Sequence, residues 1–417
     1  MADAYIIDAV RTYRGIGKMG KGALSEMHPE HLSATVLAAL RDRNNLNTAE
    51  VDDVIWGVSG AIGLQSGDIG RNAALDAGYD IKAGGVTLNR FCGSSITTTN
   101  FAASMIMSGM HDLVISGGMD MMSYVNNYGM KMHQAGLGRG AMGVGNPRLQ
   151  AKHPQSTQGV CADAIAALEG ITREELEELG YESQKRAKVA MDEGRFDKST
   201  ITVTDDDGNV VLDREEYPRP DTTREALAEL KPAFEKFLDM PSQEGGKTFR
   251  ELINQKYPDV DIKPIHHVGI SSGVVDGAAG LLLASREYAE KHGLKPRASI
   301  VAMAEIADDP TLMLNAPVPA AQKVLKKAGL TKDDIDVWEV NEAFAVVAEK
   351  FIRDLDLDRA KVNPNGGSIA LGHPIAGTGA MLIGTALDEL ERTDGRYALI
   401  TMCAAGGMAP AIIIERV

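Results

Sequence analysis

The 417-residue sequence has few aromatic residues and little basic charge. Aromatic residues make up 5% of the chain, which gives no sign of stacking platforms for nucleic-acid bases. The formal net charge of −15 would repel a phosphate backbone, and no concentrated basic stripe offsets it. We therefore expect no nucleic-acid partner, and any polyanionic small ligand must be held by a few well-placed Lys or Arg side chains.

Cysteine and long apolar runs are also scarce. Cys92, Cys161 and Cys403 form no CxxC pair and are too dispersed for a disulfide framework, which disfavours a metal site and predicts a reducing compartment. No stretch of 18 apolar residues occurs, and the N-terminal residues lack the apolar core of a signal peptide. We therefore expect a cytoplasmic protein without a membrane span.

Glycine, in contrast, is abundant, and the sequence contains an internal repeat. The 44 glycines among 44% apolar and 24% charged residues are typical of a soluble α/β enzyme with many tight turns. The segment VLAALRDRNNLNTAEVDDVIWGVSG, which ends at Gly60, resembles KVLKKAGLTKDDIDVWEVNEAFA, which ends at Ala345. Each has an amphipathic helix, a leucine turn, an acidic run and a Val/Ile/Trp strand, which indicates two similar halves.

Two further correspondences support the duplication. HDLVISGGMD, from His111, and YALITMCAAGGM, from Tyr397, are both apolar strand runs with paired glycines. The glycine-flanked turns at Cys92 and His373 also correspond. Because strands alternate with helices in each half, we expect mainly parallel sheets with right-handed crossovers.

The residues between the halves differ in composition. From about 123 to 270 the chain has a glycine-rich stretch (HQAGLGRGAMGVGNPRLQ), a charged helix and a Pro/Arg run. We interpret these residues as an inserted loop or cap domain, although a mere surface excursion is the alternative. The predicted organisation is an N-terminal half over 1–122, completed by about 271–296, the insertion over 123–270, and a C-terminal half over 297–417.

Cys92 is the candidate nucleophile. It lies in NRFCGSSITTTNF, where a short strand is followed by a Gly-Ser-Ser turn into an apolar helix. Amides at a helix N-terminus stabilise a thiolate, so we expect a lowered pKa and access to substrate. The alternative is a small buried core cysteine, but the small residues that follow favour close approach of a ligand.

Two other segments supply candidate acid–base and polar groups. His373 lies in GGSIALGHPIAGTG, where glycines leave room for a ligand beside the ring, and histidine is a natural base for a thiol. Cys403, in TMCAAGGM, is either a second reactive thiol or a buried structural cysteine. Asn341 and Glu342 follow the strand IDVWEV, where we expect an exposed polar pair, or a helix cap by Asn341.

The order of these motifs resembles that of the thiolase family. NRFCGSS, NEAFA, GGSIALGHP and CAAGGM occur in the family order and at the family separations, and DAVRT, GGMDMMS, PRPDTTREALAELKPAF and VVDGAAGLLLAS are similar too. The resemblance covers nearly the whole chain. It implies an α/β thiolase fold, in which two duplicated βαβαβαββ halves form a layered αβαβα arrangement with an inserted loop domain.

The resemblance also implies a mechanism. Cys92 would become acylated while His373 takes its proton, and Cys403 would act as the acid or base at the α-carbon of acetyl-CoA. One oxyanion hole would consist of the His373 ring with a water held by Asn341, and the other of the backbone amides of Cys92 and Ala405. Coenzyme A and acyl-CoA are then substrates, and no cofactor or metal is expected.

The resemblance also implies residues that contact coenzyme A. By resemblance, Ser272 would bond the pantetheine arm and Gln158 stands where a methionine faces it. Arg219 is the best-matched cation for the phosphates, with Arg224 and Lys188 as weaker candidates. The chain departs from the family at Ile270, where asparagine is usual, in PIAGTG after the histidine, and in an extra run near 238–263.

Two alternative functions are less consistent with the sequence. A ketoacyl synthase is disfavoured because NEAFA occupies the place of a required second histidine. A catalytically impaired CoA- or lipid-binding protein of the same family is disfavoured because Cys92, His373, Asn341 and Cys403 are all retained. Family habit implies a homodimer or homotetramer, whereas the acyl group and the physiological direction of the reaction are not predicted.

Overall fold

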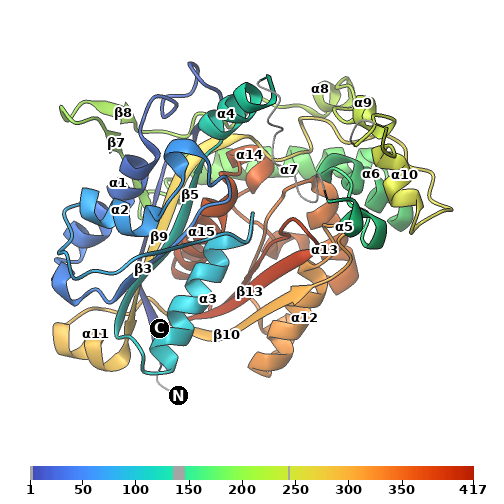
Figure 1. Cartoon of the computed structure of the whole chain (residues 1–417). Coiled ribbons are helices and arrows are strands. Elements are labelled where there is room, and N and C mark those ends of the chain that lie inside the picture. Colours follow the sequence, from blue (N-terminus) through green and yellow to red (C-terminus); the bar gives the residue numbers. More distant parts are fainter. Residues whose placement is uncertain (1–2, 135–145, 243–244) are drawn as a thin grey trace.

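The computed structural model describes residues 3–134, 146–242 and 245–417 (Figure 1). Most of the glycine-rich stretch that begins at His133 lies outside these residues. In the described part of the chain, 11 strands form one sheet, and its main path has the order β11-β12-β13-β10-β1-β9-β5-β3-β4. The short strands β2 (Gly15–Ile16) and β6 (Thr200–Ile201) pair beside this path with β9 and β1.

The two halves of the sheet repeat one strand order, which confirms the duplication. The N-terminal half contains β1 (Ala4–Thr12), β3 (Asp53–Gly57), β4 (Val86–Leu88), β5 (Leu113–Met121) and β9 (Val275–Ser285). The C-terminal half contains β10 (Ala298–Ala307), β11 (Val337–Val340), β12 (Tyr397–Thr401) and β13 (Met408–Arg416). The order β1-β9-β5-β3 thus matches β10-β13-β12-β11, and β1 joins β10 where Tyr5 lies opposite Ser299.

The sheet is mixed, and the expectation of mainly parallel sheets is wrong. The last strand of each half, β9 or β13, lies between the first strand and the remaining strands and runs antiparallel to both neighbours. Parallel pairing is found for β3 with β4, β3 with β5 and β11 with β12. The helical crossovers therefore account for the parallel part of each half, and the returning strand adds antiparallel pairs.

Helices form three layers: one outside each half of the sheet and one between the two halves. The outer helices are α1 (Pro29–Arg43), α2 (Ile69–Asp76) and α11 (Arg286–His292) on the N-terminal half, with α12 (Pro317–Ala328) and α13 (Ala345–Leu355) on the C-terminal half. The middle layer is formed by α3 (Ser94–Met107) and α15 (Thr378–Thr393), which contact each other and strands of both halves (Figure 1). Separate apolar clusters fill the outer and middle layers, which agrees with the predicted αβαβα arrangement.

Most remaining elements lie in the long connection between β5 and β9. They are α4 (Met122–Gln134), α5 (Pro147–Lys152), α6 (Gln158–Glu169), α7 (Arg173–Asp192), β7 (Val203–Thr204), β8 (Val210–Leu212), α8 (Arg224–Ala228), α9 (Glu235–Leu238) and α10 (Phe249–Asn254). Here α7 packs against α13 and against α14 (Ser368–Leu371), while α6 packs against α13 and α10. The connection therefore lies against the segments that carry the NEAFA and GGSIALGHP motifs.

The extra run near 238–263 belongs to this packed region. Leu238, Ile253 and Ile262 are buried in the same apolar cluster as α6 and α13. Tyr257 donates its hydroxyl hydrogen to Asp309 at 2.5 Å, which ties the run to the C-terminal half. The described residues of this run thus add to the core, and the division of the chain at 122, 270 and 297 stays a prediction.

Candidate active site

Cys92 lies in a strained turn at the start of α3. The preceding residue, Phe91, has a φ of +49°, which is a left-handed conformation that few non-glycine residues adopt. The Gly93 amide donates to the Arg90 carbonyl oxygen at 3.0 Å, and the Ser94 amide donates to Phe91 at 3.2 Å. Strain of this kind persists only where the surrounding structure holds it, and it is frequent at active sites.

The Cys92 side chain is buried rather than open, with 4% of its surface exposed. Burial raises the pKa of this thiol most, the neighbouring Cys403 thiol and the Asp120 carboxylate raise it further, and a backbone hydrogen bond lowers it slightly. The expected lowering of the pKa by the helix N-terminus is therefore wrong for the free chain, because the loss of hydration outweighs the amides. Cys92 rests as a neutral thiol.

His373 is buried in the turn before α15. Its backbone amide donates to the Gly273 carbonyl oxygen at 2.8 Å, and its Nδ1 lies 2.6 Å from Thr378 Oγ1. Its Nε2 has no partner among the described residues. Burial lowers the pKa of the ring to about 3, with a smaller contribution from the charge of Arg14. A neutral ring that holds its hydrogen on Nδ1 leaves the Nε2 lone pair free to accept a proton.

Asn341 follows β11 and is fully buried, so the expectation of an exposed residue is wrong. Ser368 donates its hydroxyl hydrogen to Asn341 Oδ1 at 2.5 Å, whereas Asn341 Nδ2 has no partner among the described residues. The next helix, α13, begins at Ala345 with Phe344 as its N-cap, so Asn341 does not cap it. A buried amide group with a free donor is suited to hold a water or a ligand oxygen.

Glu342 is also buried, and it links three segments. Its Oε2 accepts hydrogen bonds from the Ser183 hydroxyl at 2.7 Å and the Ile369 amide at 3.2 Å, and its Oε1 accepts one from Asn363 Nδ2 at 3.0 Å. Because Ser183 belongs to α7 and Ile369 to α14, Glu342 holds the NEAFA segment against both. The buried position follows from these donors, which replace water around the carboxyl group.

Cys403 lies in the turn that joins β12 to β13. The amides of Ala404 and Met408 donate to each other's carbonyl oxygens at 2.7 and 3.0 Å, which closes a tight turn around Ala405. Gly406 and Gly407 have φ values of +84° and +78°, which this turn requires. Cys403 is buried, and burial raises its pKa to about 12, so this thiol also rests in the neutral form.

The four segments meet at one place. A Cβ atom on Gly93 would lie 3.3 Å from the Cβ of Ala404, so the turn at Cys92 packs directly against the turn at Cys403. The start of α15 packs against the start of α3, where the Ala380 amide donates to Ser95 Oγ at 2.9 Å. The Asn341 amide donates to the Thr401 carbonyl oxygen at 3.2 Å, which places the ends of β11 and β12 side by side.

A cavity of about 800 Å³ lies next to the His373 segment. Its walls come from residues 16–19, from α4, from Tyr217, from Ala233 and Phe234, and from the segment 268–274 that contains Ser272. Val274 pairs with His373 in a short bridge, so the cavity borders the backbone of the candidate base. Gln158 is half-buried at the start of α6, where the adjacent Gly159 packs on the Phe234 ring.

The three candidate cations differ in their surroundings. Arg219 is exposed, and its guanidinium lies 6.0 Å from the centre of the Tyr217 ring at the cavity wall. Arg224 is paired with Glu178 at 2.5 Å, and Lys188 is paired with Asp192 at 2.5 Å. Arg219 is therefore better placed than the other two for a phosphate group.

Sequence reasoning missed two residues near the site. Lys18 is an exposed cation on the cavity wall, and Asp120 is a buried carboxylate whose charge acts on Cys92. Asp120 ends the apolar strand in GGMDMMS, which is a sequence signal that could have identified it. At Ile270, where the chain departs from the family, the side chain is buried and the carbonyl oxygen accepts the Ala345 amide at 2.9 Å.

Across residues 3–134, 146–242 and 245–417, no group of three or more His, Cys, Asp or Glu side chains could hold a metal ion. No helix in the same ranges is long and apolar enough to cross a membrane. Cys92, Cys161 and Cys403 are all free thiols.

Comparisons with known proteins agree with this geometry. The family model described as "Thiolase, N-terminal domain" matches residues 4–237, and "Thiolase, C-terminal domain" matches residues 294–416. The steroid 3-ketoacyl-CoA thiolase FadA6 of Mycobacterium tuberculosis is 40% identical over 100% of this chain and 95% of its own length. A beta-ketoadipyl-CoA thiolase of Acinetobacter baylyi is 40% identical over all of both chains, and a 3-ketoacyl-CoA thiolase of a Psychrobacter species is 37% identical over 100% and 98%.

These matches span both halves of the fold, and the chain belongs to the thiolase family. The resemblance inferred from the order of the motifs is thereby confirmed. The protein is an acyltransferase with thiolase function. The match to the N-terminal model ends at residue 237, immediately before the extra run near 238–263.

Proposed function

We propose that the protein cleaves or forms 3-ketoacyl-CoA thioesters through an acyl group carried on Cys92. The observation that carries this proposal is the convergence of Cys92, His373, Cys403 and Asn341 on one buried place, with polar atoms left unpartnered at His373 Nε2 and Asn341 Nδ2. An acceptor at His373 Nε2 and a donor at Asn341 Nδ2 are the groups that a transferred proton and a thioester oxygen require.

In the first step, Cys92 Sγ attacks the 3-keto carbonyl carbon of the substrate while His373 Nε2 accepts the thiol proton. Both groups rest in the neutral form because burial disfavours either charge. The proton transfer is therefore coupled to substrate binding, when the developing thiolate forms a bond rather than a buried charge. With its hydrogen on Nδ1, the ring donates to the Thr378 hydroxyl oxygen at 2.6 Å and accepts the proton on Nε2.

In the second step, the bond between the α-carbon and the former keto carbon breaks. The electron pair stays on the α-carbon as the enolate of acetyl-CoA, and the Cys403 thiol supplies the proton that completes acetyl-CoA. Free CoA then attacks the acyl group on Cys92 and gives its thiol proton to the Cys403 thiolate. His373 returns its proton to the departing Cys92 sulfur, so a shortened acyl-CoA is released and both thiols are restored. The reverse sequence condenses two thioesters, with Cys403 as the base.

Negative charge on oxygen develops in both steps. We assign one oxyanion site to His373 Nε2, in its protonated form, together with a water on Asn341 Nδ2, and the other to the amides of Cys92 and Ala405. The loss of one donor of this kind typically costs about 3 kcal/mol of transition-state stabilisation. CoA itself would occupy the 800 Å³ cavity beside Ser272, with Arg219 near its phosphates and no cofactor required.

The test is acylation of the whole chain by 3-ketoacyl-CoA substrates, followed by peptide mass spectrometry. We expect the acyl group on Cys92, and we expect thiolysis with at least one member of a series that includes acetoacetyl-CoA and longer, branched and ring-bearing substrates. Cys161→Ala is the matched control, because Cys161 contacts the Thr311 carbonyl oxygen away from the turns described above. Labelling at another cysteine would refute the mechanism, and binding of CoA without any turnover would favour a binding protein.

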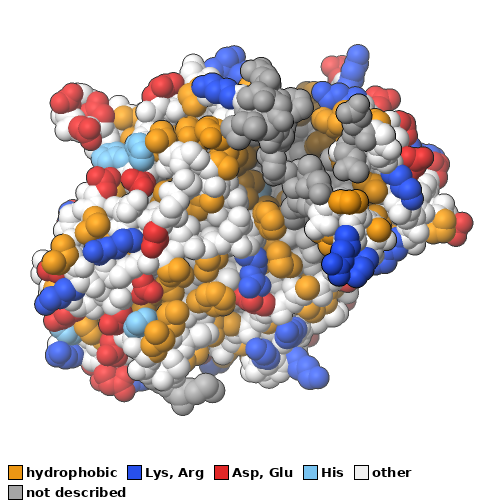
Figure 2. All heavy atoms as spheres, viewed as in Figure 1, with side chains coloured by type: hydrophobic (Ala, Val, Ile, Leu, Met, Phe, Trp, Pro, Cys, Tyr) orange, Lys and Arg blue, Asp and Glu red, His pale blue; other side chains and the backbone are white. Residues whose placement is uncertain are grey.

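We also propose a homodimer formed through the free edge of β4. The edge strand β4 is bonded to β3 on one side, and Val86 on it is exposed. Phe101 and Met110, on and just after α3, are exposed too, and Figure 2 shows hydrophobic side chains gathered over this face. An exposed strand edge next to apolar side chains favours pairing with a second copy. Size-exclusion chromatography with light scattering tests this, and Val86→Lys should shift the mass toward the monomer.

A cytoplasmic location is proposed on the chemistry of the thiols. The mechanism needs Cys92 and Cys403 in their reduced forms, and reduced thiols persist in a reducing compartment. Fractionation of the source cells, with detection of the native protein, tests the location.

A further inference from the structure

Asp120 is a buried carboxylate at the end of β5 that receives an unusual number of hydrogen bonds. The Ser59 hydroxyl donates to it at 2.6 Å, the Gly60 amide at 3.0 Å, Gln65 Nε2 at 2.6 Å and the Ala376 amide at 2.8 Å. The Ser59 amide donates as well, at 3.2 Å. The side chain is fully buried, so these donors take the place of water around the charge.

The donors come from two segments that are far apart in sequence. Residues 59–65 follow β3 and contain the short helix η2 (Gly63–Gln65), whereas Ala376 belongs to η5 (Ile375–Gly377), two residues after Pro374. Asp120 Oδ2 accepts from both segments, through the Ser59 hydroxyl and the Ala376 amide. One carboxylate oxygen therefore connects the loop after β3 with the turn that follows His373.

The backbones around this contact approach so closely that only glycine fits. A Cβ atom on Gly118 would lie 2.6 Å from the Ala376 carbonyl oxygen, and a Cβ on Gly377 would lie 2.9 Å from the Gly118 carbonyl oxygen. Gly118 in β5 and Gly377 after His373 thus pack directly against each other. The carboxylate of Asp120 lies beside this contact and fixes how η5 sits on β5.

We propose that Asp120 is a positioning residue for the acylation step, which holds the His373 turn against the turn of Cys92 through the Ala376 amide. This inference rests on the proposed role of Cys92 as the acyl carrier and of His373 as its base. Asp120 does not touch the reacting atoms. Its carboxylate acts through the backbone of η5, so that loss of the acceptor moves the His373 ring relative to the thiol.

The charge of Asp120 also disfavours the thiolate form of Cys92, which opposes its favourable effect on the position of His373. It is near enough to raise the pKa of Cys92, and burial raises the pKa of Asp120 itself to about 6 despite its donors. The neighbouring Cys403 thiol also raises the pKa of Cys92. Removal of the Asp120 charge should therefore make the thiol easier to ionise while it makes turnover slower, and a purely structural role would not produce this combination.

The test compares full-length Asp120→Asn with the wild-type protein in two assays. We expect the rate of Cys92 acylation, measured by rapid quench with an active 3-ketoacyl-CoA, to fall roughly 10- to 100-fold, because small misplacements of a catalytic group cost rates of this order. We expect the KM to change much less than kcat. Alkylation of Cys92 by iodoacetamide at pH 7.5 should instead become about two- to fivefold faster, since it follows the thiolate fraction.

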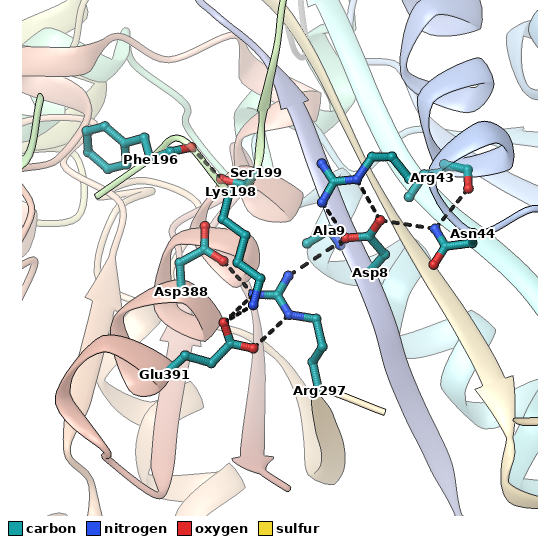
Figure 3. Close-up of polar contacts among 11 residues, drawn as sticks. Asp8, Ala9, Arg43, Asn44, Phe196, Lys198, Ser199, Arg297, Asp388 and Glu391 are labelled. Carbon is teal, nitrogen blue, oxygen red and sulfur yellow. Dashed lines mark hydrogen bonds and ion pairs between the residues drawn. The ribbon is translucent and has the colours of Figure 1, made fainter. Parts of the chain in front are cut away.

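The matched control is Asp8→Asn, another buried carboxylate with several donors. Asp8 accepts hydrogen bonds from Asn44 Nδ2 at 3.0 Å and from the Ala9 amide at 2.9 Å, and it pairs with Arg43 at 3.0 Å (Figure 3). It also faces Arg297, which pairs with Asp388 and Glu391 on α15. This network stabilises the junction of the two halves and has no contact with the His373 turn among the residues drawn.

Both variants should be destabilised to a similar degree, and Asp8→Asn should keep acylation and alkylation within about twofold of wild type per folded molecule. Ser59→Ala is the milder second variant, because it removes one donor from Asp120 Oδ2 and should slow acylation about threefold. If Asp120→Asn does not fold, Ser59→Ala decides the question against the same control.

The proposal is overturned if the wild-type protein is acylated on Cys92 but Asp120→Asn, or Ser59→Ala where that variant decides, keeps the same acylation rate as Asp8→Asn. A failure of wild-type acylation refutes the proposed function instead, so the two failures are distinguishable.

Discussion

The turn before α3 and the turn before α15 occupy matching positions in the two halves, yet they carry different chemistry. Cys92 precedes α3 and His373 precedes α15, and each follows a backbone position with a positive φ, Phe91 at +49° and Gly372 at +99°. Burial acts on both side chains, raising the pKa of the thiol and lowering that of the imidazole to about 3. Both groups are therefore neutral at rest.

Duplication thus supplied two corresponding helix starts, and the side chains before them diverged into a nucleophile and a base. An ion pair of thiolate and imidazolium would be costly in this dry environment, because neither charge is hydrated. The neutral pair avoids that cost until a substrate arrives.

Replacement of His373 by Asn should lower kcat/KM for thiolysis about 10³-fold, because a positioned base contributes on this order. The rate of Cys92 alkylation should change little, since the resting ring does not ionise the thiol. Steady-state kinetics and alkylation of the same preparation measure both. Thr378→Val, which removes the partner of Nδ1, should cause a smaller loss, and an unchanged kcat/KM in His373→Asn would contradict the assignment of the base.

Replacement of Asn341 by Ala should lower kcat about 100-fold through loss of one oxyanion donor. Substrate binding should be nearly unchanged, because the donor acts on charge that develops during the reaction. Ser368→Ala removes the hydrogen bond to Asn341 Oδ1 and should give an intermediate effect. Equal kcat values for Asn341→Ala and the wild type would place the oxyanion site elsewhere.

The pH dependence of Cys92 alkylation tests whether the thiol and the imidazole both rest in the neutral form. A raised pKa means that the thiolate is the minor form at neutral pH, so the rate should climb about tenfold per pH unit from pH 6 to 9. Mass spectrometry of the Cys92 peptide measures it. A plateau between pH 5 and 7 would instead indicate a thiolate–imidazolium pair and would break the description of both turns as neutral.

The smallest effect is expected for Arg219, which lies beside Tyr217 on the cavity wall. Arg219→Ala should raise the KM for CoA about fivefold and leave kcat nearly unchanged, because an exposed charge contributes on the order of 1 kcal/mol. Arg224→Ala is the control, since its guanidinium is already paired with Glu178, and its KM should stay close to wild type. Equal KM values for the two variants would argue against a phosphate contact at Arg219.

Much of the site could be predicted from the sequence because its residues lie in local motifs. The turns at Cys92, His373 and Cys403 are each encoded by neighbouring glycine and serine residues, and their order along the chain identified the family. The burial of Asn341 could not be predicted in this way. It depends on the packing of α7 and α14 over the end of β11, which are segments remote from NEAFA in sequence.

The duplicated strand–helix pattern, the family and the candidate groups at Cys92, His373 and Cys403 can be recognised from residue type and local spacing alone. The mixed pairing of β9 and β13, the neutral resting state of the thiol and imidazole, and the contact of Asp120 with the His373 turn cannot. Strand partners, hydration and long-range hydrogen bonds are set only when distant segments pack together.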